Sequence, residues 1–117
     1  MLQQQFPGAS AARLPSGAYL VTVPDFPVCA GWTLSRTTVW FIVPVGYPYA
    51  NPDCFWVDKG LQLATGAMPQ NSNITVVPET NITGIWFSWH LAHPWNPNTD
   101  TLLTWTAVIS NRLRAAR

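Results

Sequence analysis

The segment Val45–Phe55 has the sequence VGYPYANPDCF and separates two of the most apolar runs of the chain. Pro48 and Pro52 each fix φ and lack an amide hydrogen, so neither fits in a central strand of a sheet. The residues before them, Tyr47 and Asn51, are restricted to extended geometry because the proline ring clashes with other conformations. We therefore expect a rigid corner, built on Tyr47, Pro48 and Pro52, that ends one strand and leads into the next.

The sequence predicts strands on both sides of this corner. Thr37–Val43 (TTVWFIV) is an almost unbroken run of β-branched and aromatic residues, which is typical of a strand buried on both faces. Ala18–Val23 precedes it as another strand, and Cys54–Val57 follows the corner as a third. Gly84–His90 (GIWFSWH) is compatible with a strand or a helix. The spacing of these segments indicates an antiparallel β-meander.

Two stretches of the chain lack a regular pattern. Pro24–Trp32 (PDFPVCAGW) contains two prolines and is expected to be a loop. Asp58–Thr80 contains glycines, prolines and a polar QNSN patch, so we expect a long irregular loop there.

The C-terminal part of the chain predicts a helix. Leu102, Trp105, Ile109 and Leu113 follow one another at helical spacing. Suitable N-cap residues stand just before this run, namely Asn98, Thr99 and Asp100.

The opposite end of the chain indicates a short or truncated N-terminal helix. Leu2–Phe6 resembles the last turn of a helix, and Pro7 and Gly8 would end it. Together with the predicted strands and the C-terminal helix, this indicates an α+β fold. We expect a single domain over residues 1–117, with its core at about 12–115.

The composition excludes several classes of function. The chain has 117 residues, of which 9% are charged, and a formal net charge of +1, so bulk charge attracts no nucleic acid. The longest apolar run is far shorter than the roughly 20 residues of a membrane span, and no export signal is visible. We therefore expect a cytoplasmic protein with no membrane or nucleic-acid partner and no cofactor.

A candidate site lies near the aromatic segment. Ser88 and His90 are two residues apart, which places both side chains on one face if the segment is extended. His90 would then act as base or polariser, with Ser88 as acceptor and Asp100 orienting the ring, in a pocket between the corner and the C-terminal helix. The alternative is a histidine paired with backbone. No metal is expected, because His90 and His93 lack a third ligand at a suitable spacing.

Three tryptophans crowd the same region, namely Trp86, Trp89 and Trp95. Either they pack the C-terminal helix onto the sheet or they form an aromatic contact surface for a partner.

The two cysteines are candidates for structural or chemical roles. Cys54 lies inside a predicted strand, where a small apolar core residue is the simple interpretation and a nucleophile is the alternative. Cys29 lies in a predicted loop beside Gly31 and Trp32, and nothing nearby in the sequence lowers the pKa of a thiol there. Two cysteines are too few for a disulfide scaffold.

Taken in order, these motifs resemble the ubiquitin-conjugating-enzyme-like superfamily. The corner at Tyr47-Pro48 and Pro52 is similar to its Tyr-Pro-x-x-Pro-Pro turn, and Trp95-Asn96-Pro97 is similar to the Trp-Ser-Pro element that opens its later helix. The prokaryotic family E of that superfamily is the closer resemblance. The matching segments run in the same order over most of Ala18–Leu113: Gly46-Tyr47-Pro48, Pro52–Asp58, Leu61-Gln62-Leu63, Trp86–His90 and Trp95–Asp100.

The resemblance implies a place in a bacterial ubiquitin-like modification system. Its implied partners are a ubiquitin-like protein, an activating-enzyme-like protein and a JAB-type isopeptidase. Conjugating enzymes carry their cargo as a thioester on cysteine, and the superfamily's cysteine position falls near Phe87 or Ser88, neither of which is cysteine. We therefore expect a ubiquitin-conjugating-like protein that lacks the catalytic cysteine.

Two alternatives remain open from the sequence. A catalytically silent module would bind a ubiquitin-like protein or a partner enzyme. An unrelated α+β domain would instead use exposed tryptophans to stack on carbohydrate.

Overall fold

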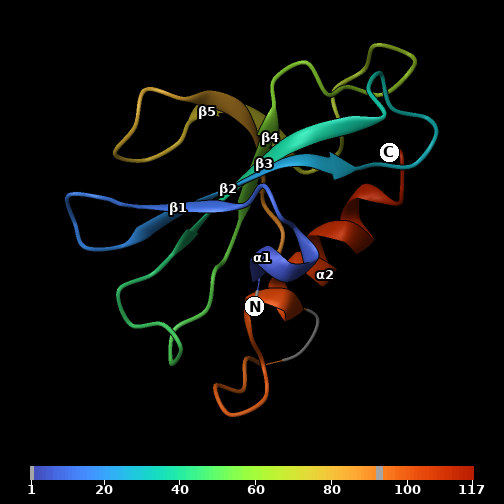
Figure 1. Ribbon diagram of the computed structural model, residues 1–117. Coiled ribbons are helices and arrows are strands. Elements are labelled where there is room, and N and C mark those ends of the chain that lie inside the picture. Colours follow the sequence, from blue (N-terminus) through green and yellow to red (C-terminus); the bar gives the residue numbers. More distant parts are fainter. Residues whose placement is uncertain (1, 92–93) are drawn as a thin grey trace.

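A computed structural model describes residues 2–91 and 94–117 as a six-stranded sheet with a helix against one face (Figure 1). Every pair of neighbouring strands in it is antiparallel, and the order across the sheet is β1-β2-β3-β4-β6-β5. The elements are α1 (Leu2–Gln5), β1 (Ser10–Arg13), β2 (Tyr19–Pro27), β3 (Arg36–Val43), β4 (Phe55–Asp58), β5 (Ser72–Val76), β6 (Thr83–Phe87) and α2 (Leu102–Leu113). The predicted α+β class, antiparallel sheet and C-terminal helix are confirmed.

The central strands and their order agree with the sequence analysis. Strands β1 to β4 pair in succession as a meander, and the β5–β6 hairpin then adds to β4 through β6. The ambiguous segment Gly84–His90 is a strand only as far as Phe87, where β6 ends, and Ser88 to His90 follow without regular structure. At the N-terminus, α1 is a single helical turn just before Pro7.

Neither edge strand was predicted from the sequence. An irregular loop was expected over Asp58–Thr80, whereas β5 lies inside that stretch, and no element was expected at β1. All four residues of β1 are exposed, and β5 is exposed or half-buried throughout. An edge strand that buries no face carries no alternation of apolar and polar residues, so the pattern that reveals a strand is missing.

Strand β2 also runs further than predicted, through Pro24 to Pro27, where a loop was expected. Its register with β3 shifts between Val23 and Phe26, which marks a bulge. Strand β1 pairs only with residues Tyr19 to Thr22, so the prolines lie where β2 has no partner on that side. Proline is tolerated at such unpaired edges and bulges, which explains the difference.

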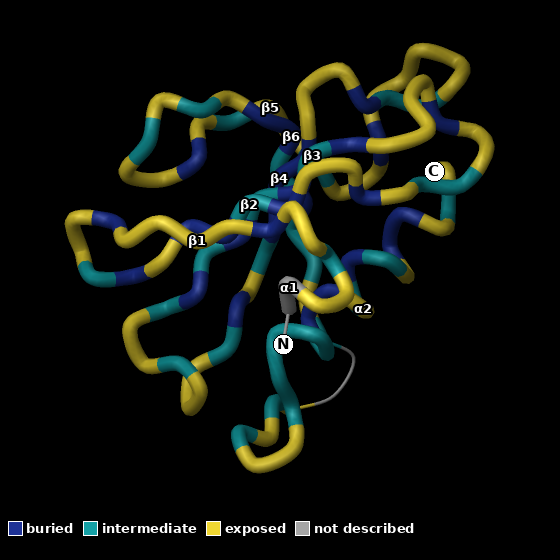
Figure 2. The backbone as a smooth tube through the Cα atoms, viewed as in Figure 1, coloured by how far each residue is buried: buried dark blue, intermediate teal, exposed yellow. Residues whose placement is uncertain are grey.

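Alternation along the strands produces two apolar clusters, one on each face of the sheet. The larger lies under α2 and includes Val39 and Phe41 of β3 with Trp105 and Ile109 of the helix, all with no exposed surface. The smaller lies on the opposite face, around Trp56. Figure 2 shows buried residues along the central strands and α2, with the hairpins and the corner largely exposed.

Two hairpin tips cover the smaller cluster in place of a second helix. The tip between β1 and β2 and the tip between β5 and β6 come from opposite edges of the sheet and meet at Ser16 and Glu79. The Ser16 N–H donates to Glu79 Oε1 at 2.8 Å, and the Ser16 hydroxyl donates to Glu79 Oε2 at 2.7 Å. Leu14 and Val77, from the two tips, are buried beneath this contact.

Helix α2 begins at a capping box. Thr101 is the N-cap, its side chain accepts from Leu103 N–H, and the Thr104 hydroxyl accepts from the Thr101 N–H. The predicted N-caps Asn98, Thr99 and Asp100 are therefore wrong by one to three residues, because these residues form the turn before the helix instead. None of the helices within residues 2–91 and 94–117 has both the length and the apolarity to cross a bilayer.

Near its end, α2 holds a buried cation. Arg112 is 2% exposed, and its guanidinium lies over the rings of Phe87 at 4.8 Å and Trp89 at 5.3 Å. It donates to the carbonyl oxygens of Gln70, Ala115 and Arg117. Arg112 therefore joins the C-terminal residues and the segment before β5 to the core. Burial, and secondarily the charge of Arg117, lower the pKa of this guanidinium.

Replacing Arg112 should destabilise the fold strongly. Arg112→Ala removes three hydrogen bonds and the guanidinium that packs on Phe87 and Trp89, and it leaves the Gln70 carbonyl without its donor. We therefore expect a loss of about 2–4 kcal/mol in the free energy of unfolding, measured by urea denaturation. Arg112→Lys should recover little of it, because an ammonium group cannot reproduce the planar fork. The matched control, exposed Arg114→Ala, should change stability by less than about 0.5 kcal/mol. Equal effects of the two alanine variants would contradict this role.

Candidate functional site

The proline corner lies between β3 and β4, and backbone hydrogen bonds fix its first half. After β3, the Tyr47 N–H donates to the Pro44 carbonyl at 3.0 Å, and the Ala50 N–H donates to the Gly46 carbonyl at 3.0 Å. The Tyr47–Pro48 peptide bond is cis. Neither proline of the corner lies in a strand, which agrees with their missing donors.

Trp95 connects the corner to the segment that leads into α2. Its indole Nε1–H donates to the Pro48 carbonyl at 2.7 Å. Its ring tilts against Tyr47, with 6.2 Å between the ring centres. Because Tyr47 also packs against the larger cluster, these contacts fix the corner to the body of the domain.

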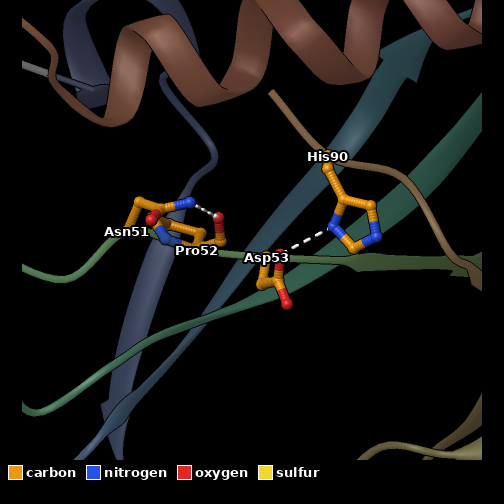
Figure 3. Close-up of polar contacts among 4 residues, drawn as sticks. All are labelled: Asn51, Pro52, Asp53 and His90. Atoms are coloured by element: carbon orange, nitrogen blue, oxygen red, sulfur yellow. Dashed lines mark hydrogen bonds and ion pairs between the residues drawn. The ribbon is translucent and has the colours of Figure 1, made fainter. Parts of the chain in front are cut away.

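Asp53 and His90 form an ion-pair-type contact beside the corner (Figure 3). Asp53 Oδ1 lies 2.7 Å from His90 Nδ1, and their side chains are 74% and 60% exposed. A pair this exposed contributes about 1 kcal/mol or less to stability. The expected pocket around His90 is therefore wrong: the imidazole lies on an open surface.

The pairing of β4 with β6 explains why these two residues meet. Phe55 lies opposite Phe87, and their rings stack with 4.9 Å between centres. If the same register continued two residues beyond this pair, Asp53 would face Trp89, next to His90 in the chain. The ladder thus brings Asp53 close to the residues after β6, and the contact with His90 forms just beyond the paired strands.

The contact assigns the ring nitrogens of His90. A carboxylate only accepts hydrogen bonds, so Nδ1 carries the hydrogen that Asp53 receives. In the neutral ring, Nε2 is then left with a lone pair and can accept a hydrogen bond or a proton from a partner.

Asp100, predicted to orient His90, closes the turn before α2. Its Oδ2 accepts from the Asn96 N–H at 2.8 Å, and its own N–H donates to the Asn96 carbonyl at 2.7 Å. The partner of His90 is Asp53, the carboxylate just before β4. It was not predicted because the sequence does not show how β4 pairs with β6.

Ser88, predicted as the acceptor beside His90, is half-buried just after β6. Its N–H donates to the Asn71 carbonyl at 3.0 Å. His90 Nδ1 is occupied by Asp53, so the predicted arrangement of Ser88, His90 and Asp100 is not the one that the structure shows.

The three tryptophans do not form one surface. Trp86 packs with the smaller cluster on one face of the sheet, and Trp89 packs against the larger cluster on the other. Trp95 lies at the corner. Trp89 contacts α2 through Arg112, whose guanidinium lies over its ring. Trp86 and Trp89 pack with different clusters, so these two side chains do not share one surface.

Neither cysteine faces His90. Cys54 follows Asp53 in the chain, and its side chain packs against the smaller cluster. Burial raises the pKa of the Cys54 thiol and is the largest effect. A hydrogen bond from Trp86 lowers this pKa, and the negative charge of Asp53 raises it further. Cys29 is half-buried at the end of α2, with Sγ 2.9 Å from the Arg114 carbonyl oxygen.

No group of three or more metal-ligating side chains is found in the part of the chain that the structure describes. His93, the second histidine of the spacing considered above, lies outside the described residues.

Comparison with known families gives one result. The family model described as prokaryotic E2 family E matches residues 12–116. No curated protein and no solved structure is significantly similar to the chain.

The raised pKa of Cys54 predicts a slowly reacting thiol. In a Cys29→Ser background, alkylation of Cys54 by iodoacetamide at about pH 8 should be at least about tenfold slower in the folded chain than in urea, because only the thiolate reacts. The midpoint of its pH–rate profile should lie on the alkaline side of that of the unfolded chain. A folded-state midpoint on the acidic side would show an activated thiolate and contradict the assignment.

Proposed function

The chain belongs to prokaryotic E2 family E, and from that premise we propose that it serves a ubiquitin-like modification system by binding, without carrying a thioester. We take residues 1–117 as one such domain, with its core at about 12–115, that acts in the cytoplasm. The match over residues 12–116 and the sheet with its C-terminal helix support this extent.

The observation that carries the proposal is the chemistry around His90. Its exposed imidazole is held by a carboxylate, while Cys54 packs against the smaller cluster and burial raises the pKa of its thiol. The position at which the superfamily carries its cysteine, near Phe87 or Ser88, has no thiol either. Phe87 is fully buried in the core, and Ser88 carries a hydroxyl. A thioester needs an accessible thiolate, and the described site has none beside its histidine.

The surface available for binding is the corner together with the Asp53–His90 pair. Val45 is 70% exposed and Tyr49 is 82% exposed, while hydrogen bonds and Trp95 hold the backbone beneath them. Exposed apolar side chains on a fixed backbone, beside hydrogen-bonding groups, suit a protein partner, because little backbone entropy is lost on binding. We propose the system's ubiquitin-like protein as that partner, and the activating-enzyme-like protein and JAB-type isopeptidase as further members.

A charging assay tests the proposal. The chain is incubated with the activating enzyme, ATP and the ubiquitin-like protein of its own organism, and the products are separated on a non-reducing gel. We expect no adduct, because no reactive thiol is presented. Titration calorimetry with the same ubiquitin-like protein should show binding that weakens at least about fivefold in Tyr49→Ala and in His90→Ala. Exposed Lys59→Ala is the matched control and should bind as the unaltered chain does.

Specific outcomes would overturn the proposal. A thiol-sensitive adduct that disappears in Cys54→Ser would show thioester carriage. A hydroxylamine-sensitive adduct that survives thiol and disappears in Ser88→Ala would show an oxyester. Absence of both adduct and binding would remove the ubiquitin-like protein as a partner.

A further inference from the structure

A groove of about 630 Å³ lies between the residues that follow α1, the bulged end of β2 and one side of α2. None of its lining residues belongs to the corner or to the Asp53–His90 pair, so it is separate from the surface discussed above. We call it the α2 groove. Figure 1 shows α1 and α2 side by side where it lies. Its volume falls in the range of ligand-binding sites in proteins, about 300–1,000 Å³.

One part of the α2 groove is apolar and preformed. Phe6 stacks on Phe26 with 5.3 Å between ring centres, and Phe26 is 1% exposed, so the Phe6 ring is supported from below. Gly8 lies so close to Pro24 that an added Cβ on Gly8 would be 2.9 Å from the proline ring. The residues after α1 therefore contact the bulged end of β2 directly. Leu103 of α2 completes the apolar lining opposite. A large apolar side chain would find a rigid surface here.

The rim of the α2 groove is basic. Arg36 and Arg114 both line it, and neither lies within ion-pair distance of a carboxylate among residues 2–91 and 94–117. Arg36 Nη1 donates to the Asp25 carbonyl oxygen at 3.1 Å, and Arg114 Nη1 lies 3.4 Å from Asn111 Oδ1. Each guanidinium has five N–H donors, so most of them stay free for a ligand. Asp25 is the one carboxylate among the lining residues, so the two arginines give the rim a net positive charge.

We propose that the α2 groove binds an acidic peptide segment that carries one large apolar side chain. The apolar side chain rests on Phe6 and Leu103, and carboxylates of the peptide accept from Arg36 and Arg114. Ser110 and Asn111, which also line the groove, offer polar groups to the peptide backbone. A peptide is favoured over a lipid surface because the cationic side chains rim a concave site and do not form a flat patch.

The probe is a display library of random nine-residue peptides selected against the full chain. We expect the enriched peptides to combine Phe or Leu with at least two acidic residues. Synthetic versions with a fluorescent label should bind in anisotropy titrations, and affinity should fall at least about tenfold in the double variant Arg36→Gln/Arg114→Gln. Binding should also weaken as salt rises from about 50 to 300 mM, since charge pairs on a solvated rim are screened.

Matched variants keep the test specific. Arg13→Gln removes an exposed arginine of β1 outside the groove and should leave the affinity unchanged. Ala107→Glu places a negative charge, which repels an acidic peptide, on an exposed, groove-lining position of α2. It should weaken binding as the double variant does, while circular dichroism shows that the helix is retained.

Each other outcome overturns the proposal. Enrichment of neutral or basic peptides, no enrichment, or binding that is indifferent to Arg36→Gln/Arg114→Gln would each do so. Co-sedimentation with vesicles of phosphatidylcholine and phosphatidylserine at 3:1, if lost in the double variant, would assign the groove to anionic lipid instead. Because the charging assay above uses other residues, its failure leaves this result unaffected.

Discussion

The structure depends most on the antiparallel register in which Phe55 of β4 faces Phe87 of β6. This pairing places both rings under α2, stacked on each other, and sets Val57 opposite Ile85 on the same face. Because strand side chains alternate, a slip of one residue would turn these apolar residues away from the helix and bury others. Arg112 reinforces the arrangement, since its guanidinium lies over the Phe87 ring and binds the Gln70 carbonyl before β5.

The residues just before β4 decide the chemistry of the surface beside the corner. Asp53 and Cys54 are adjacent in the chain but have different neighbours. The carboxylate reaches His90, while the thiol joins the smaller cluster beside Trp86. A member of an E2 family with this geometry keeps a histidine on its surface and presents no thiolate to it. The proposed binding role needs no covalent intermediate on this surface.

Whether a strand or helix could be predicted from the sequence depends on how much of its side-chain surface is buried. The central strand β3 and helix α2 were predicted because their apolar residues recur with a clear period. The edge strands β1 and β5 were missed because their side chains remain largely exposed. The residues of the corner were predicted from the stereochemistry of proline, which acts only on neighbouring residues. The partner of His90 could not be predicted, because the sequence alone does not distinguish Asp53 from Asp100. The α2 groove likewise brings together Phe6, Arg36 and Arg114, whose proximity no local pattern indicates.

The most direct test of the central claim is disulfide trapping at the end of the β4–β6 ladder. In a Cys29→Ser background, Asp53→Cys and His90→Cys are combined with Cys54→Ser, and the rate of disulfide formation under mild oxidation is measured by mass spectrometry. The contact between Asp53 and His90 predicts rapid crosslinking of this pair, whereas His90→Cys with native Cys54 should stay reduced under the same conditions. Rapid crosslinking to native Cys54 would place the thiol beside the histidine and contradict the account.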